Sequence, residues 1–215
     1  PSTALWQEKQ VEICDWLINR VGVDAVYVDQ IAAAPPVNCM DKSHAHRRGG
    51  GSWWYEHYYN LLDHLALRAN PERGYTTESN AEPFVGRVGG MLVWHWSGDH
   101  QVPAFPAIYA GYQPMMGRNY DAFAPGDGAA FLIMTAQSLC FGDQPGWLLP
   151  AAYKNSPHKA LFKAVARVRH QYGEYFYAGR CLRPPQLTGD VGRISGPALS
   201  PDGVLCALWE RRGDG

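Results

Sequence analysis

The sequence predicts an α/β protein in which strands and helices alternate along the chain. Short runs rich in β-branched and aromatic residues, each bounded by a charge or by a turn-forming residue, predict the strands. They lie at 24–29, 75–79, 90–96, near 104–110 and near 139–142. Longer stretches with apolar residues at helical spacing predict helices at 53–70, 128–139 and 157–176, with a helix or turn near 82–88. A first helix precedes all of these.

Start and stop signals support the helix boundaries. Ser2 or Thr3 can cap the first helix, and Gly22 ends it. Ser52 directly precedes the second helix and is a residue type that often caps helices. Between these helices the segment 31–51 is rich in proline and glycine, so we expect a long loop there.

Strands separated by helices imply parallel βαβ units with right-handed crossovers. Their lengths suit a (β/α)8 TIM barrel, which usually takes about 250 residues. We therefore predict that residues 1–183 form the C-terminal part of such a barrel. Residues 184–215 contain strand-like runs around a Pro-Asp-Gly turn and predict the start of a small β domain. A doubly wound open sheet is the alternative, although the sequence has no glycine-rich dinucleotide loop.

Composition excludes several classes of function. A net charge of −1 argues against a nucleic-acid partner, and no apolar run reaches the length of a membrane span. We see no signal peptide and no cofactor motif, and nothing in the sequence indicates an oligomeric state. The scattered cysteines favour reduced thiols, and so slightly favour a cytoplasmic protein, over a disulfide framework. They are Cys14, Cys39, Cys140, Cys181 and Cys206.

Polar and aromatic residues follow the predicted strands, where the loops of a parallel α/β fold form the mouth of a site. Two of them are carboxylic acids on neighbouring strands, Asp29 and Glu78. Glycoside hydrolysis needs two such groups, one to donate a proton and one to attack the anomeric carbon or activate water. We predict Asp29 as the nucleophile and Glu78 as the general acid/base. Glu82 is the alternative acid, although it lies beyond the strand.

A resemblance to a known group rests on five motifs between about residues 22 and 112. They are GVDAVYVDQIAAAPP, CMDKSHAHRRGGGSWW, TTESNAEPF, VWHW and FPAIYAGY. Together they resemble a poorly characterised family within the glycosidase-type TIM-barrel superfamily. The resemblance implies a retaining glycoside hydrolase whose nucleophile closes the fourth barrel strand, matched by Asp29, and whose acid on the next strand is matched by Glu78. By this resemblance the chain lacks the first strands of the barrel, which would complete the pocket.

Aromatic rings stack on sugars, so the remaining strand-end residues predict a carbohydrate-binding site without a metal. Its expected members are Gln30, His44, His46, Trp94, His95, Trp96 and Tyr109. Two alternatives stay open. Cys39, Asp41, His44 and His46 carry metal-ligand atoms and would suit a metal-dependent barrel hydrolase or lyase. A non-catalytic carbohydrate-binding fragment is the second alternative.

Overall fold

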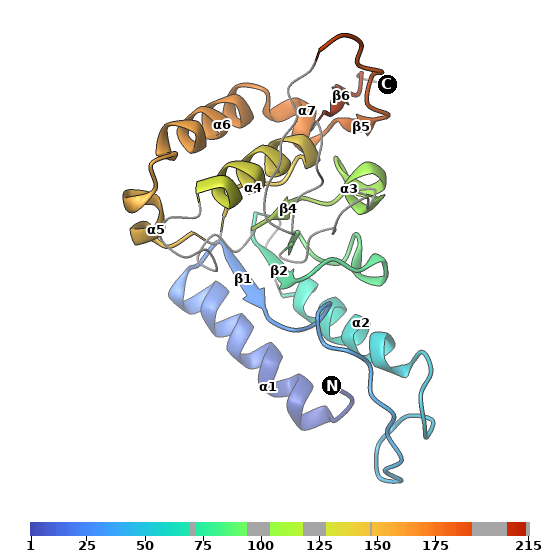
Figure 1. The fold of residues 1–215 in the computed structure, drawn as a ribbon. Coiled ribbons are helices and arrows are strands. Elements are labelled where there is room, and N and C mark those ends of the chain that lie inside the picture. Colours follow the sequence, from blue (N-terminus) through green and yellow to red (C-terminus); the bar gives the residue numbers. More distant parts are fainter. Residues whose placement is uncertain (69–71, 94–103, 118–127, 147, 191–205, 214–215) are drawn as a thin grey trace. The chain divides into compact units, whose positions relative to one another are not determined.

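The computed structural model describes residues 1–68, 72–93, 104–117, 128–146, 148–190 and 206–213. It is mixed α/β, as the sequence predicts, with strands in the order β1-β2-β3-β4 in one sheet and a separate β5-β6 pair (Figure 1). The chain divides into two compact units, residues 1–91 and 92–215, which we describe one at a time. In the described ranges we find no helix with the length and apolar character of a membrane span.

The first unit alternates helices and strands in the predicted order. Its elements are α1 (Ala4–Asp15), the π-helical turn η1 (Trp16–Val21), β1 (Ala25–Val28), α2 (Trp53–Ala66), β2 (Gly74–Glu78), the 3-10 turn η2 (Glu82–Phe84) and β3 (Gly90–Leu92), where the second unit begins. Thr3 occupies the N-cap position of α1 and Ser52 that of α2. Gly22 ends η1 with a left-handed backbone at φ 86°, which glycine adopts without steric cost.

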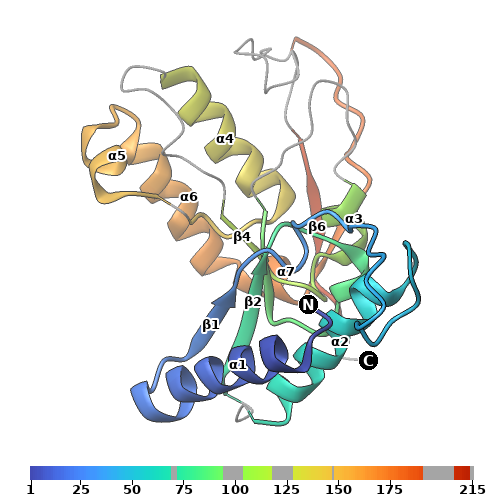
Figure 2. The same ribbon diagram turned by 90° about the horizontal axis from the view of Figure 1, so that it is seen from below.

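Strands β1 and β2 run parallel, with Ala25 opposite Gly74 and Val28 opposite Thr77. One face of β1 is buried through Val26 and Val28, and α1 and α2 lie beside this strand pair (Figure 2). The other face carries Tyr27, which is 43% exposed. Burial of β1 on both faces, which the apolar run 25–28 suggests, is therefore wrong. Among the described strands β1 is the edge of its sheet, so it lacks the neighbours that bury both faces of a central strand.

The second unit is mainly helical. It contains α3 (Ala104–Tyr109), β4 (Met115–Met116), α4 (Gly128–Phe141), α5 (Pro150–Asn155), α6 (Lys159–Gln171), α7 (Gly173–Tyr177), β5 (Arg180–Leu182) and β6 (Leu208–Glu210). Strands β5 and β6 pair antiparallel, with Cys181 opposite Trp209. The β domain expected from residue 184 onward stays a prediction.

Two predicted strands of this unit are wrong. Residues 104–109 form the short helix α3, and Pro106 fits there because the first turn of a helix does not need its missing N–H. Residues 139–141 continue α4, and Gly142 then reverses the backbone at φ 77°. Both segments are short apolar runs, in which residue composition alone does not distinguish a strand from a buried helix.

Arg169 is the main buried cation of the second unit and is 4% exposed. Its guanidinium lies over the rings of Phe176 and Tyr177 and donates a hydrogen bond to the carbonyl of Gly142. The indole N–H of Trp209 donates to the carbonyl of Cys140 at 3.0 Å. These contacts fix α4, α6, α7 and β6 within the unit.

Candidate functional site

Asp29 and Glu78 come together at the carboxyl ends of two paired strands. The register places Val28 opposite Thr77, so the next residues along each chain, Asp29 and Glu78, are also opposite each other. Side chains alternate along a strand, so Asp29 shares the exposed face of β1 with Tyr27. The sequence pattern thus placed both acids at the edge where a parallel sheet carries its functional groups.

The two carboxyl groups lie close to each other and to Gln30. The side-chain amide of Gln30 donates a hydrogen bond to the Glu78 carboxyl oxygen Oε2, and Asp29 is near enough to raise the pKa of Glu78 through a hydrogen bond and through its charge. Tyr27 lies near both acids, and their charges help to raise the pKa of its hydroxyl. The two acids and Gln30 thus lie within interaction distance of one another at the strand ends.

Burial and charge separate the two acids. Glu78 is 7% exposed, whereas Asp29 is exposed. Burial raises the pKa of Glu78, and both the hydrogen bond and the negative charge of Asp29 raise this pKa further, while the amide of Gln30 lowers it. Burial also raises the pKa of Tyr27, helped by the charges of Glu78 and Asp29. The surroundings of Glu78 therefore favour its protonated form.

Each acid is followed by a residue whose backbone is left-handed. Gln30 has φ 64° and Ser79 has φ 63°, and they are the non-glycine residues with positive φ in the described part of the chain. Such a backbone is uncommon outside glycine and strained for an ordinary side chain. Both strands therefore end in the same sharp reversal directly after the carboxyl group. Repeated strain of this kind is typical of functional sites.

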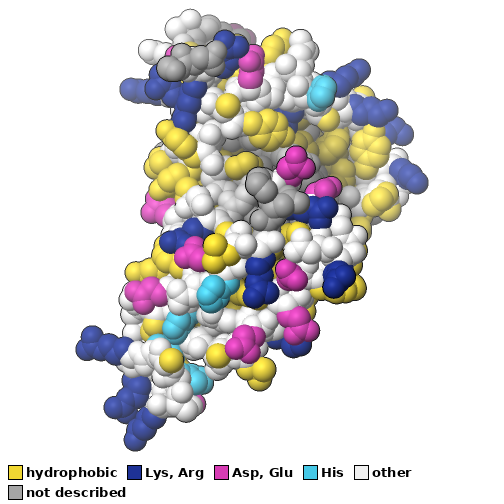
Figure 3. Space-filling view, turned by 180° about the vertical axis from the view of Figure 1, so that it is seen from behind, with side chains coloured by type: hydrophobic (Ala, Val, Ile, Leu, Met, Phe, Trp, Pro, Cys, Tyr) yellow, Lys and Arg dark blue, Asp and Glu magenta, His cyan; other side chains and the backbone are white. Residues whose placement is uncertain are grey.

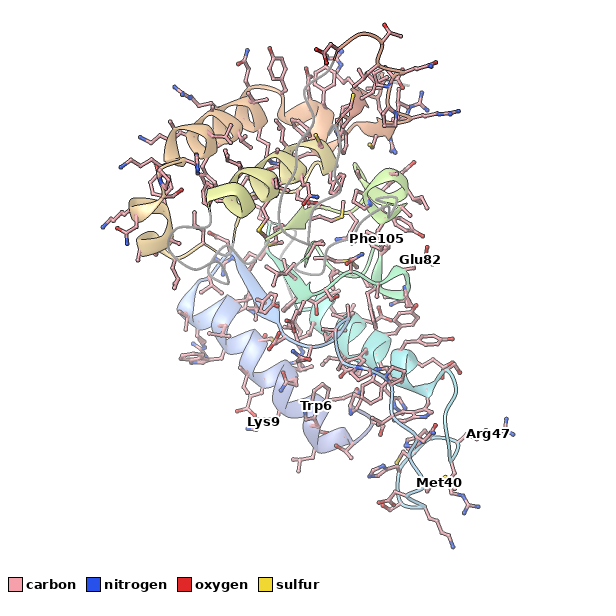
Figure 4. All side chains as sticks on the ribbon, in the orientation of Figure 1. Trp6, Lys9, Met40, Arg47, Glu82 and Phe105 are labelled. Atoms are coloured by element: carbon pink, nitrogen blue, oxygen red, sulfur yellow. The ribbon has the colours of Figure 1, made fainter. Side chains whose placement is uncertain are left out.

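Glu82, the alternative acid, opens the 3-10 turn η2 and is exposed (Figure 4). It lies four residues beyond Glu78, past the reversal at Ser79. Its position is typical of an acid at the start of a helical turn, where the N–H groups favour negative charge. Burial and the bond to Asp29 distinguish Glu78 from it.

The loop between β1 and α2 gathers a second set of polar groups. Cys39, His44 and His46 each place one potential ligand atom within 4.8 Å of the others. The Sγ atom of Cys39 lies 3.2 Å from Nδ1 of His44. The ring of His46 stacks on Trp53, with centroids 4.0 Å apart and planes 7° from parallel. This donor set is the part of the described chain that could hold a metal.

The other predicted sugar-binding residues have different outcomes. Trp94, His95 and Trp96 lie outside the described residues. Tyr109 is half-buried at the end of α3, where its ring lies 4.8 Å from that of Phe105. It belongs to the second unit, so its relation to Asp29 stays a prediction.

Tyr27 is a neighbour of the two acids that the sequence prediction missed. Its spacing of two residues from Asp29 on a strand puts both side chains on one face, which was the available signal. The pattern of hydrophobic residues instead suggested packing for this ring.

Comparisons with known proteins identify a family for this chain and two relatives. Residues 1–120 match the profile of a family described as "Domain of unknown function (DUF6259)". A "Putative glycoside hydrolase 22789" from Monosiga brevicollis is 29% identical over 216 residues, covering 87% of this chain and 18% of that protein. A "Putative glycoside hydrolase" from Bacteroides thetaiotaomicron is 30% identical over 197 residues, covering 88% of this chain and 29% of that protein. The chain thus spans less than a third of either relative.

Proposed function

Since the chain belongs to the DUF6259 family and is similar to two proteins whose names read "Putative glycoside hydrolase", we propose that it contributes a catalytic carboxyl pair to a glycoside hydrolase. The substrate is a carbohydrate with an O-glycosidic bond. The observation that carries the proposal is the position of Asp29 and Glu78 at adjacent ends of parallel strands, where Asp29 raises the pKa of Glu78. We further propose that these strands belong to a (β/α)8 barrel, whose mouth lies at the carboxyl ends of its strands.

Glu78 acts as the general acid. Its burial and its contact with Asp29 both favour the protonated form, which is the form that donates to a leaving group. Glu78 gives its proton to the glycosidic oxygen as the bond from that oxygen to the anomeric carbon breaks. Asp29 attacks this carbon and forms a glycosyl ester.

Water then completes the reaction. The Glu78 carboxylate takes a proton from a water molecule, and the resulting hydroxide oxygen bonds to the anomeric carbon while the bond to Asp29 breaks. Asp29 leaves as a carboxylate and Glu78 is again protonated. The closeness of the two acids, through which Asp29 raises the pKa of Glu78, favours retention of configuration, because a retaining pair is about 5–5.5 Å apart and an inverting pair about 6.5–9.5 Å apart.

Gln30 and Tyr27 position the pair. Gln30 donates a hydrogen bond to Glu78, and Tyr27 lies beside Asp29 on the same face of β1. The side chains of Trp94, His95, Trp96 and Tyr109, which the sequence predicts at the site, would then line the sugar subsites.

The test uses the complete natural protein, a screen of glycans and aryl glycosides, and three variants. Asp29→Asn should remove measurable turnover. Glu78→Gln should lower kcat on glycans by about 10²–10⁴-fold, because general acid catalysis contributes that much. Its loss should be smaller on aryl glycosides with acidic leaving groups, which depart without a proton. Added azide should restore part of the turnover of Glu78→Gln, since azide attacks the glycosyl ester without a general base.

Glu82→Gln is the matched control and should keep activity close to that of the wild type. A 2-deoxy-2-fluoro glycoside with a good leaving group should leave a glycosyl adduct on Asp29, detected by mass spectrometry of the peptide. Equal hydrolysis by Asp29→Asn and wild type would remove Asp29 from the mechanism. If Glu82→Gln lost activity while Glu78→Gln kept it, Glu82 would be the general acid in place of Glu78.

A further inference from the structure

We propose that Cys39, His44 and His46 bind a Zn²⁺ ion that cross-links the loop between β1 and α2. Their three ligand atoms lie within 4.8 Å of one another, and all three side chains are half-buried. Zinc prefers sulfur and nitrogen ligands of this kind. The loop projects beyond α1 and α2, with Met40 and Arg47 on its two arms (Figure 4). The ion would join those arms.

His44 already has the orientation of a zinc ligand. Its Nδ1 atom lies 3.2 Å from the Cys39 sulfur, close to the separation of about 3.5 Å that tetrahedral zinc imposes on a nitrogen and a sulfur ligand. Its other nitrogen, Nε2, lies 3.7 Å from the carboxylate of Asp41. Histidines that bind metals usually direct the second ring nitrogen to a carboxylate or a carbonyl group. Asp41 supplies that outer partner.

His46 is oriented by the same kind of contact. Its Nδ1 atom lies 2.8 Å from the carbonyl oxygen of Arg47, so Nδ1 carries the proton and donates. The Nε2 atom then has a free lone pair, and in the structure it is buried without a hydrogen-bond partner. A buried acceptor without a partner is costly, and a metal ion would satisfy it. Stacking on Trp53 fixes the ring plane.

The backbone holds the ligands in place without a metal. Cys39 and Gly49 exchange both backbone hydrogen bonds, at 3.1 and 2.7 Å, which closes the base of the loop. Asp41 accepts hydrogen bonds from the backbone N–H and the hydroxyl of Ser43. The indole of Trp53 donates to the Gly49 carbonyl at 3.1 Å. A site whose ligands are ordered beforehand loses little entropy on binding.

Charge around the loop is compatible with a cation bound through a thiolate. Lysine and arginine side chains gather at the loop tip beside the histidines (Figure 3), with exposed side chains at Lys42, Arg47 and Arg48. Because these heads reach into water, their repulsion is screened. Zinc binding releases the thiol proton of Cys39, and the resulting thiolate charge offsets half the charge of the ion.

Zinc gives His44 and His46 a structural role in place of the sugar contact expected from the sequence. None of the three ligands takes part in the proposed hydrolysis, so the metal site and the carboxyl pair can fail separately. The ion would fix the loop that leaves β1 directly after Asp29 and Gln30. Three protein ligands leave the fourth zinc position to water.

The test measures zinc binding directly. Protein purified under reducing conditions is stripped with a chelator, and Zn²⁺ is titrated against a coloured competing chelator. We expect one zinc ion per chain. Cys39→Ser and His46→Ala should each weaken binding at least about 100-fold, and Asp41→Asn should weaken it by about 10–100-fold, as outer-shell changes do. His64→Ala and Cys181→Ser are the matched controls and should bind as the wild type does.

Cobalt gives a second readout. Co²⁺ bound to the stripped protein should show a thiolate charge-transfer band that is absent in Cys39→Ser and present in Cys181→Ser. Circular dichroism verifies that each variant is folded like the stripped wild type. The proposal is wrong if the stripped protein binds no zinc at micromolar concentration, or if the ligand variants bind as tightly as the controls.

Discussion

Asp29 and Glu78 lie opposite each other at the ends of two adjacent parallel strands. Burial raises the pKa of Glu78, and a hydrogen bond and the negative charge from Asp29 raise it further. The protonated form of Glu78 is therefore favoured at the position where the proposed reaction needs a proton, and its titration links stability to pH.

The first prediction concerns stability against pH. The folded pKa of Glu78 lies above its usual value of 4.5, so the folded protein binds this proton more tightly than the unfolded chain does. The contribution is complete below pH 4.5 and is lost as pH rises through the raised pKa. Urea unfolding across this range should show the wild type losing stability relative to Glu78→Gln, in which residue 78 cannot titrate. Parallel curves for the two proteins would contradict the raised pKa.

The second prediction concerns the pH dependence of activity. The side-chain amide of Gln30 lowers the pKa of Glu78 by donating a hydrogen bond to its carboxylate. Gln30→Ala should therefore raise that pKa and move the alkaline limb of the kcat/KM profile to higher pH, because Glu78 must be protonated to act. Gln10→Ala, on the separate helix α1, should leave the profile unchanged. A shift to lower pH in Gln30→Ala would argue against this role for the amide.

The sequence predicted much of this site because it depends on short-range patterns. Two predicted strands each end in an acid. Because parallel strands bring their carboxyl ends to one edge of the sheet, the sequence predicts that Asp29 and Glu78 lie close together. The contact of Tyr27 and the left-handed backbone of Gln30 could not be predicted in the same way. Both depend on the geometry of the chain reversal after the strand. Neither glutamine nor tyrosine is a residue type that predicts such a reversal.

In the second unit, the local sequence pattern predicted the wrong secondary structure for one segment. The run 104–110 has aromatic and branched residues typical of a strand, yet it forms α3. Six residues contain too few turns for helical spacing to become visible, so burial against neighbouring segments decides the outcome. Val93, Ala110 and Met115 supply that packing, with Phe105 against them. Such long-range contacts cannot be read from a local pattern.

The third prediction tests strain at the reversal after β2. Ser79 has φ 63°, a conformation that glycine adopts freely. Ser79→Gly should therefore raise the free energy of unfolding by about 1 kcal/mol, measured by urea denaturation. Ser52→Gly is the control, because Ser52 has φ −68° and its side chain makes no cap hydrogen bond. If Ser79→Gly is destabilising while Ser52→Gly is neutral, the serine side chain contributes more than the strain costs.

The fourth prediction tests the close approach of chain segments around β5. A Cβ atom added at Gly179 would lie closer than van der Waals contact to the carbonyl oxygens of Tyr175 and Glu210 and would clash with both. Both oxygens are backbone atoms, one at α7 and one at β6, so neither can move aside without shifting its element. Gly179→Ala should therefore destabilise the protein by about 1–3 kcal/mol, the usual cost of overpacking.

Gly213→Ala is the matched control, because its added Cβ would meet no atom within 4 Å. Its free energy of unfolding should stay within about 0.5 kcal/mol of the wild-type value. Thermal and urea unfolding of both variants measure the difference. Equal stability of Gly179→Ala and Gly213→Ala would mean that β5 does not pack this closely between α7 and β6, since a backbone clash cannot be relieved by a change of side-chain rotamer.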